Sequence, residues 1–211
     1  IHVVIKPGNR ILTNGPHGNT DSQAPDGNCP FDTGWAEYTE GHVATAEFWE
    51  CEKPRPPAGK VEPIELEKVL IETAELFEKD ASNDGRITTT KKIQSNIWIS
   101  MDPVHLRQIL WNLLLNASEA IDGEGVIDIE MYASKSKRAC IKITDNGCGM
   151  SQEELKTIFD PFFTTKPYGT GLGLSIVHRI LEAYDLWLNV ESEEHKGTTF
   201  TLQFKPMDSP T

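Results

Sequence analysis

Apolar residues recur with two different periods from about residue 60 onward, and each period predicts one kind of element. Spacings of three and four residues, as between Leu66, Val69, Leu70 and Phe77, place apolar side chains on one face of a helix. Alternating runs, or runs rich in Thr and Ile, are typical of strands. The predicted helices cover 64–80, 103–121 and 175–184, with a short one ending near 158 after the capping box of Ser151 and Glu154. The predicted strands cover 86–93, 96–100, 126–133, 139–144, 186–191 and 198–204.

The first 59 residues lack this periodicity. Proline and glycine occur there in runs such as Pro7-Gly8 and Pro54-Arg-Pro-Pro57, which mark turns and break helices. A short strand over 1–5 and a helical turn over 44–51 are the exceptions that we expect. The N-terminal part is therefore predicted to be largely irregular.

Composition narrows the classes of partner and of location. The formal net charge of −12 argues against a nucleic-acid partner, because binding to phosphate backbones needs basic patches. No apolar run approaches the roughly 18 residues of a membrane span, and no signal-peptide pattern opens the chain. The cysteines are unevenly spaced, and neither they nor His17 and His42 fit a zinc pattern. Reduced cytosolic thiols are therefore expected at Cys29, Cys51, Cys140 and Cys148.

Two asparagines interrupt the predicted helix over 103–121. Asn112 and Asn116 lie one turn apart, on a line with Gln108 and with Glu119 or Ala120, away from the leucine stripe. An amide within an apolar helix is unfavourable unless it is hydrogen-bonded. Either the two amides are capped or face solvent, or their oxygens are presented to a hydrated cation or to phosphate.

An acid followed by two glycines ends the strand predicted over 139–144. In Asp145-Asn-Gly-Cys-Gly, the carboxylate can accept a hydrogen bond from a ligand. Gly147 and Gly149 allow the backbone to approach a flat ligand closely. The stretch therefore predicts a pocket for a flat, hydrogen-bonding group.

Two further runs complete the set of candidate motifs. Residues 159–166 carry three phenylalanines, two threonines and Lys166; core packing explains one or two of the aromatic rings, and a mobile lid explains the run as a whole. Gly169-Thr-Gly-Leu-Gly-Leu174 leads into a helix, whose N-terminal N–H groups suit an anion. The run follows no strand and lacks the Lys-Ser/Thr of a phosphate loop, so neither a dinucleotide fold nor a P-loop fits.

In this order, the motifs resemble the N box, first glycine box, F box and second glycine box of the ATP-binding catalytic domain of sensor histidine kinases. That superfamily also holds the Hsp90 chaperones, type II topoisomerases and MutL proteins. The run from Asp160 to Leu174 looks most like the nitrogen-regulation class. The resemblance covers residues 60–206 and implies an α/β (α+β) fold of Bergerat type, a two-layer sandwich whose mixed sheet is covered on one face by helices. Residues 1–59 would be an irregular segment and linker, and 207–211 a tail.

The resemblance implies a role for each motif residue. Asn116 would bind Mg²⁺, Asn112 would assist at metal or phosphate, and Lys166 would hold phosphate; these three are the candidate catalytic residues. Asp145 would accept a hydrogen bond from the adenine amine, and Thr199 or Thr198 would support the adenine end. The implied nucleotide contacts are Asn116, Asp145, Gly147, Gly149, Phe159, Thr165, Lys166, Gly169, Thr170, Gly171, Leu172, Gly173 and Thr199.

One position separates transfer from hydrolysis. In the Hsp90 and MutL relatives, a glutamate one turn before the metal asparagine activates water, whereas this chain has Asn112 there. An amide is not a base, so the γ-phosphoryl of ATP should await another nucleophile. The resemblance implies Mg-ATP as cofactor, a histidine on a dimerisation hairpin as acceptor, and then a response-regulator aspartate.

The acceptor hairpin is not recognisable in residues 1–59. His2 has the spacing to Pro7 of the family's H box, but lacks the acid that follows the histidine. We expect this chain to be a monomer that does not label itself. The full-length protein is expected to be a homodimer in the cytoplasm, with anchoring to the inner membrane left open.

Two alternatives of other classes remain open at this point. One is a nucleotide-gated switch without phosphotransfer, against which the intact Asn116, Asp145 and glycines argue. The other is a serine kinase of the anti-sigma-factor type, against which the long Phe-Phe-Thr-Thr-Lys run argues.

Overall fold

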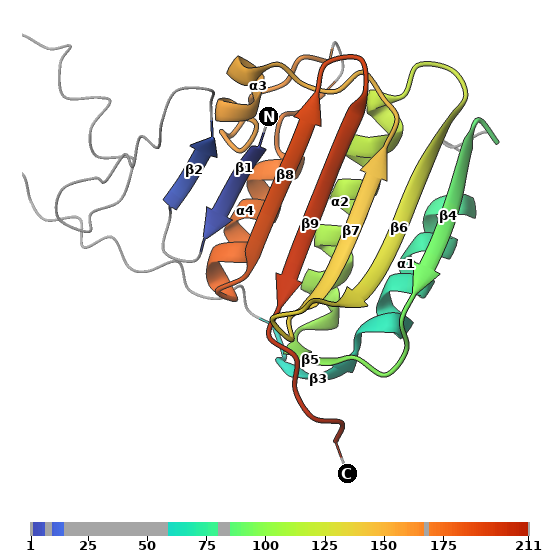
Figure 1. Cartoon of the computed structure of the whole chain (residues 1–211), viewed down its shortest axis with the longest axis vertical. Helices are drawn as coiled ribbons and strands as arrows, with labels where there is room; N and C mark the ends of the chain where they lie inside the picture. The colour runs from blue at the N-terminus through green and yellow to red at the C-terminus, as the bar shows by residue number, and fades with distance from the viewer. Residues whose placement is uncertain (1, 7–9, 15–58, 80–84, 167–168, 211) are drawn as a thin grey trace, which may run out of the picture.

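A seven-stranded sheet with helices on one face forms the body of the molecule (Figure 1). The computed structural model describes residues 2–6, 10–14, 59–79, 85–166 and 169–210. The strands are β1 (His2–Lys6), β2 (Arg10–Asn14), β3 (Glu62–Glu65), β4 (Ile87–Ile93), β5 (Trp98–Met101), β6 (Gly125–Ala133), β7 (Ala139–Asp145), β8 (Trp187–Glu193) and β9 (Gly197–Phe204). The helices are α1 (Leu66–Lys79), α2 (Pro103–Ala120), α3 (Gln152–Thr157) and α4 (Gly173–Ala183).

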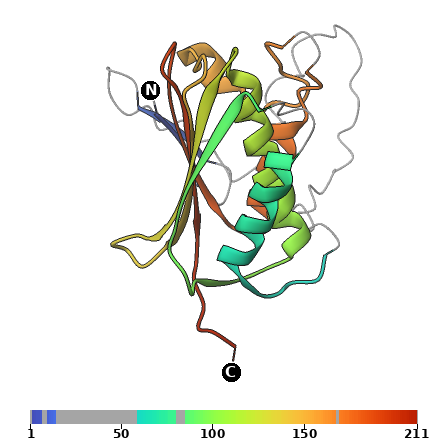
Figure 2. The same ribbon diagram turned by 90° about the vertical axis from the view of Figure 1, so that its right-hand side faces the viewer.

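The sheet is mixed, with strand order β2-β1-β8-β9-β7-β6-β4. Only β4 and β6 pair in parallel within this order, and every other neighbouring pair is antiparallel. Strand residues alternate between the two faces: Ile141 and Ile143 are buried toward the helices, whereas Lys142 and Thr144 between and beyond them lie on the open face. Figure 2 shows α1, α2 and α4 on the same side of the sheet. The predicted two-layer α/β fold is confirmed.

Helix α2 is the middle helix of this layer, in contact with α1 and α4. Asp102 caps its N-terminus by accepting a hydrogen bond from Val104 N at 2.7 Å, and proline at 103 suits the first helical position. The predicted apolar stripe is buried, with Leu106, Ile109 and Leu110 fully covered. Packing on both sides fixes the direction in which the remaining face of α2 points.

A strand that the sequence did not predict, β3, changes the boundary of α1 and the position of β5. The helix predicted over 64–80 begins at Leu66, because residues 62–65 form β3 and pair with β5 in a separate two-stranded sheet. At the start of α1, Leu66 N donates a hydrogen bond of 2.9 Å to Ile97 O, the residue before β5. The strand predicted at 96–100 is shifted accordingly to 98–101.

The N-terminal segment contributes more regular structure than the sequence predicted. The expected first strand is present as β1, but β2 pairs with it as a second strand, and β1 also pairs with β8. Val3 of β1 is fully buried. The helical turn predicted over 44–51 lies outside the described residues.

Asp185, two residues after the end of α4, adopts a left-handed backbone conformation with φ 55°. Cys140 and Cys148 are free thiols, whereas Cys29 and Cys51 lie outside the described residues. In the described part of the chain, no helix is long and apolar enough to cross a membrane, and no group of three or more His, Cys, Asp and Glu residues could hold a metal.

Candidate functional site

The second half of α2 presents two amides with different surroundings. Asn112 Nδ2 donates to Gln108 O of the preceding turn, at 2.8 Å. Asn116 Nδ2 is buried and finds no hydrogen-bond partner among the described residues. Buried polar groups are nearly always paired, so an orphaned amide indicates a place where a ligand supplies the partner.

The start of α4 lies against these two amides. A Cβ added to Gly173 would lie 3.1 Å from Asn112 Oδ1 and 4.0 Å from Asn116 Nδ2, so the first turn of α4 lies close to both amides. The N-cap residue Leu172 offers no side-chain cap, so the first N–H groups of α4 are open to an acceptor. A helix N-terminus beside an unpaired amide suits a phosphate group.

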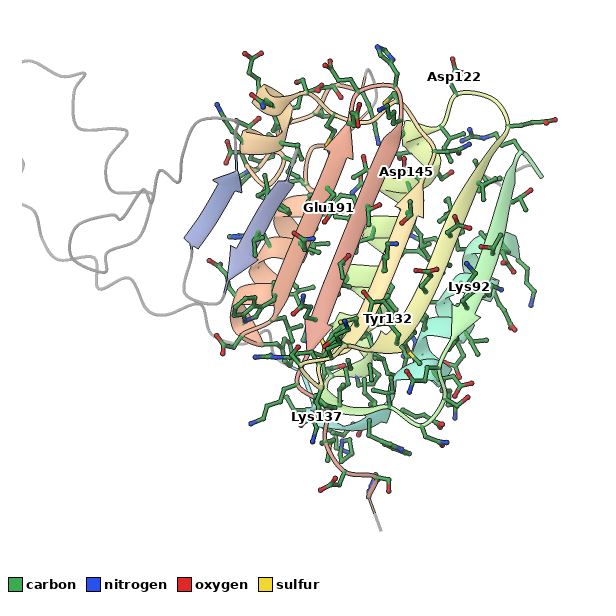
Figure 3. The ribbon with its side chains drawn as sticks, in the orientation of Figure 1. Lys92, Asp122, Tyr132, Lys137, Asp145 and Glu191 are labelled. Carbon is green, nitrogen blue, oxygen red and sulfur yellow. The ribbon has the colours of Figure 1, made fainter. Side chains whose placement is uncertain are left out.

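Asp145 lies at the other end of the site, where β7 finishes (Figure 3). Its side chain is buried, and Oδ1 accepts hydrogen bonds from Gly147 N at 2.9 Å and Thr198 N at 3.2 Å. Burial raises the pKa of Asp145, while these two hydrogen bonds and the charge of Lys166 oppose the rise. The carboxyl group is thus held by backbone N–H groups of the loop after β7 and of β9.

The glycines after Asp145 pass between α2 and the β8–β9 turn. Cys148 N donates to Ala120 O at 2.8 Å, and a Cβ on Gly147 would lie 2.5 Å from the same oxygen. Gly149 has φ 67°, and a Cβ there would lie 2.0 Å from Glu193 O. These contacts exclude a side chain at 147 and 149, so both glycines are required by packing against the protein's own backbone. The predicted approach of this backbone to a flat ligand stays a prediction.

Residues 159–166, the lid segment, carry the three phenylalanines in three different environments. Phe159 is buried and stacks on His178 of α4, with ring centroids 5.6 Å apart. Phe163 is half-buried against the core, and Phe162 is 75% exposed with a left-handed φ of 67°. Core packing therefore explains Phe159 and most of Phe163, whereas the ring of Phe162 lies largely in solvent.

The lid segment is joined to the glycine run before α4. Phe162 N donates to Gly171 O at 3.0 Å, and Gly169 N donates to Lys166 O at 3.2 Å. Thr170 Oγ1 accepts from Leu172 N at 3.4 Å, and Thr165 is exposed. The predicted lid and the predicted phosphate run are therefore one connected structure.

Lys166 does not point freely into solvent. Its Nζ lies 2.5 Å from Oε2 of Glu119, a residue on α2 that the sequence had placed on the asparagine line without a role. The sequence signal that could have placed Glu119 at the site was its position three residues after Asn116, on the same side of the helix.

His178 of α4 lies in a packed environment. Besides Phe159, it lies near Glu182, with Nδ1 to Oε2 at 3.8 Å. Burial lowers the pKa of His178, and the charges of Glu182 and Asp160 oppose this. Its Nε2 is buried without a partner among the described residues.

Thr198 and Thr199 fall on opposite faces of β9. Thr198 is buried beside Asp145, whereas the hydroxyl of Thr199 lies 3.1 Å from that of Thr144 on the open face. Of the two threonines that the sequence offered for the adenine end, the structure brings Thr198 to Asp145 and places Thr199 away from it.

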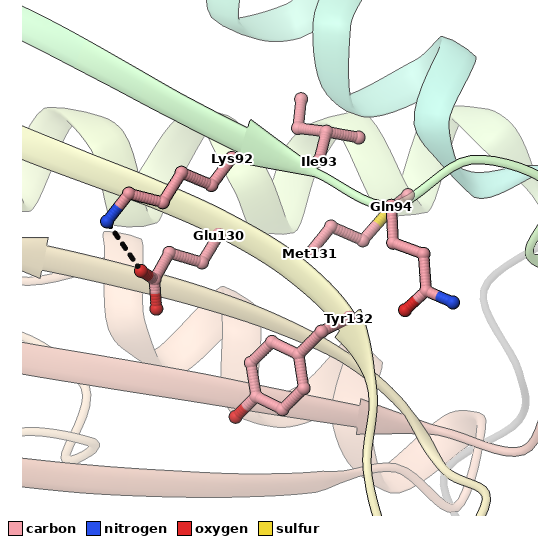
Figure 4. A pocket seen from close by; sticks show the side chains of 6 residues that line it. All are labelled: Lys92, Ile93, Gln94, Glu130, Met131 and Tyr132. Carbon is pink, nitrogen blue, oxygen red and sulfur yellow. Dashed lines mark hydrogen bonds and ion pairs between the residues drawn. The ribbon is translucent and has the colours of Figure 1, made fainter.

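A hollow of about 440 Å³ lies on the open face of the sheet, apart from these residues (Figure 4). Its wall includes the ion pair of Lys92 with Glu130, 3.3 Å apart, and the ring of Tyr132. Because Asn116 and Glu119 project from the helix layer on the other side of the sheet, this hollow is not part of the candidate site.

Comparison with known proteins adds family evidence. Residues 101–208 match the family model described as histidine kinase-, DNA gyrase B-, and HSP90-like ATPase. The chain is 37% identical over 148 residues to the sensor histidine kinase ZraS of Klebsiella oxytoca, covering 70% of this chain and 32% of that protein. It is 32% identical over 174 residues to sporulation kinase A of Bacillus subtilis, covering 82% of this chain and 28% of that protein. The chain thus spans about a third of the length of these relatives.

Solved structures show the same likeness. The full-length ShkA in complex with AMPPNP matches with a TM-score of 0.64 and 27% identity, over 74% of this chain and 33% of ShkA. The catalytic domain of the histidine kinase ThkA matches with a TM-score of 0.62 and 28% identity, over 71% of this chain and 99% of that domain.

Proposed function

Because this chain belongs to the histidine kinase-, DNA gyrase B- and HSP90-like ATPase family, we propose that it is the ATP-binding catalytic domain of a sensor histidine kinase. The observation that carries the proposal is the pairing of two ends in one site. The orphaned Asn116 amide faces the open N-terminus of α4, and the buried Asp145 lies beyond the last turn of α2. The proposed domain spans residues 60–206.

Asp145 would bind the adenine base. Its carboxylate would accept a hydrogen bond from the exocyclic amine, and the Gly147–Gly149 backbone would lie along the ring. Thr198, which holds the carboxylate through its N–H, would support this end. The ATP analogue in the ShkA structure supports a nucleotide as ligand.

The phosphate end would be formed by α2, α4 and the lid segment. Residues 169–173 would offer backbone N–H groups to the phosphates, and Asn116 would offer both amide atoms. Mg²⁺ would be held here by Asn116 Oδ1, because a neutral amide oxygen suits an ion that already carries triphosphate oxygens and water. The unpaired Nδ2 of the same residue is a donor and would face a phosphate oxygen. The ion would neutralise charge that develops on the transferred group.

The residues present support transfer rather than hydrolysis. Asn112 donates to the α2 backbone and has no basic atom with which to activate water. The γ-phosphoryl would therefore pass to an imidazole nitrogen of an acceptor histidine, with a P–N bond formed, the P–O bond to ADP broken and the imidazole proton released. Positioning and charge neutralisation would supply most of the catalysis.

The remaining partners follow from the names of the relatives. The chain spans only part of their length, so the acceptor hairpin, the response regulator and a homodimeric full-length protein are proposals. A location on the cytoplasmic side, with or without a membrane anchor, belongs to the same proposal.

Calorimetric titration with a non-hydrolysable ATP analogue and Mg²⁺ tests the site. We expect weak binding by the wild type and a loss of at least about tenfold in affinity for Asp145→Ala, which removes a charged hydrogen-bond acceptor. Asp128→Ala is the matched control, because that carboxylate lies on the neighbouring strand and pairs with Thr90 on the open face. No binding by the wild type, or undiminished binding by Asp145→Ala, would disprove the site.

Mixing the chain with a separately made dimerisation hairpin and labelled ATP tests the reaction. Acid-labile label on the hairpin is expected, and none on the chain alone. Acid-stable label on a serine would instead indicate a serine kinase, and binding without any label would indicate a nucleotide-gated switch.

A further inference from the structure

One ion pair joins the lid segment to the helix that carries both asparagines. Lys166 Nζ and Glu119 Oε2 are 2.5 Å apart, although the two residues are separated by 47 positions in the chain. Glu119 lies one helical turn beyond Asn116 and directly before Ala120, whose backbone O accepts from Cys148 N in the glycine run after Asp145. The ion pair therefore connects the lid segment to α2 within the candidate site.

The backbone of the lid segment is held near the same place. Lys166 N donates to Thr164 Oγ1 at 3.1 Å, and Lys166 O accepts from Gly169 N. Phe159 anchors the other end of the segment in the core. Between these fixed points, the Lys166–Glu119 pair is the side-chain ion pair that connects the described lid residues to α2.

The site holds more negative than positive charge before a ligand arrives. Glu119 and Asp145 both lie near the end of α2, and the charge of Lys166 is one of the influences that lower the pKa of Asp145. A nucleotide brings three or four further negative charges. Lys166 is then the cation for which Glu119 and the phosphates compete.

Resting on the proposed nucleotide site, we propose that Glu119 is a positioning residue, which holds Lys166 and the lid segment in the nucleotide-free chain and releases Lys166 to a phosphate group when nucleotide binds. Glu119 does not touch the reacting atoms in this scheme. Its effect on binding comes only through Lys166.

The solvent exposure of the ion pair allows Lys166 to leave Glu119 for a phosphate group. The side chains of Lys166 and Glu119 are 33% and 51% exposed, so the pair is partly hydrated and its contribution is screened. Breaking such a pair changes an equilibrium by roughly 1.5- to 5-fold. A phosphate with a higher charge can displace a carboxylate held this weakly.

Hydrogen exchange in the nucleotide-free protein tests the holding role. Glu119→Gln and Lys166→Gln should each speed exchange of the amides in 159–166 by about two- to fivefold, and 0.5 M salt should do the same to the wild type. Glu119→Asp should behave nearly as the wild type. Glu72→Gln is the matched control, because it breaks the 3.0 Å pair with Arg107 elsewhere on α2 and should leave the lid unchanged.

Affinity for the ATP analogue tests whether Lys166 passes from Glu119 to a phosphate group. Under this proposal, Glu119→Gln and Lys166→Gln should change the affinity in opposite directions. Glu119→Gln removes the competitor and should tighten binding about two- to fivefold. Lys166→Gln removes the phosphate partner and should weaken binding about tenfold. A structural role of the pair would weaken binding in both.

The outcomes separate this proposal from the proposed function. Unchanged lid exchange in both glutamine variants overturns the holding role, whether or not ATP binds. Weaker binding by Glu119→Gln overturns the transfer of Lys166 from Glu119 to phosphate and would assign the ion pair a structural role instead. Absence of nucleotide binding by the wild type overturns the proposed function. The hydrogen-exchange rates of the lid segment would still show whether the ion pair holds that segment.

Discussion

The carboxyl group of Asp145 combines deep burial with a small number of hydrogen bonds. Burial raises its pKa, and the N–H groups of Gly147 and Thr198 only oppose that rise. A folded-state pKa above the unfolded value means that the folded chain binds protons more tightly. The stability that this site contributes is therefore present below the unfolded pKa and is lost as pH rises through the folded pKa.

We predict that Asp145→Asn stabilises the nucleotide-free chain at pH 7, because the amide oxygen keeps both hydrogen bonds without a buried charge. The gain should shrink as pH falls and vanish below about pH 4, where the aspartate is protonated in both states. Urea unfolding at several pH values measures it. A variant that is less stable at pH 7 would mean that the ionised carboxylate is well compensated.

Gly149 is fixed by its surroundings as well as by its backbone conformation. We predict that Gly149→Ala lowers the free energy of unfolding by roughly 3 kcal/mol or more, because left-handed strain adds to a collision with Glu193 O. Gly123→Ala is the control, since Gly123 has φ 80° but nothing within 4 Å of an added Cβ. It should cost about 1 kcal/mol. Equal losses in urea unfolding would show that the collision is relieved.

Candidate site residues could be named from sequence wherever residue type alone carried the signal. An asparagine pair inside an apolar helix and a strand-ending Asp followed by glycines are such cases, and the structure places the glycine run after Asp145 against Ala120, at the end of the helix that carries both asparagines. The choice between Thr198 and Thr199 could not be made, because a shift of one residue in a strand moves a side chain to the other face. Glu119 lacked a role until its partner, 47 residues away, was located.

At the scale of elements, β1 has one face against the core and one on the open side. Val3 is fully buried, whereas its neighbour Val4 is half-buried on the other face. We predict that Val3→Asp detaches β1 from β8 and speeds hydrogen exchange in 2–6 and 187–191, because a charge would enter the apolar layer.

The adjacent position supplies the control for this prediction. Val4→Asp should leave exchange in both strands nearly unchanged, and neither variant should affect the β6–β7 pair. Fast exchange throughout the sheet in Val3→Asp would show that β1 is required by the whole fold rather than by its edge.

Helices and hairpins were predictable because their signals are local. The boundaries of α2 and α4 and the β6–β7 hairpin agree with the sequence to within about three residues. The strand at 62–65 was missed because Pro63 and two glutamates give it little strand character, and its partner β5 lies beyond α1. The addition of β1 and β2 to the sheet was unpredictable for the same reason, since His2 pairs with Glu191.

For the whole molecule, the two-layer arrangement followed from the family resemblance rather than from periodicity. Alternation indicates which side of a strand is buried, but not which strands are neighbours. The observed order places β9 between β7 and β8, so that Ala139 pairs with Phe204 and Trp187 with Gln203. Only a long-range contact could have revealed this order.

The central position of β9 sets the order of events during synthesis. Among the described strands, the ribosome makes β9 last, yet β9 alone connects β8, with β1 and β2, to β7, β6 and β4. Until residues 197–204 emerge, the nascent chain holds two separate sheet fragments with unpaired edges. Folding of this domain is therefore delayed to the end of its translation, the interval in which chaperones have most reason to bind it.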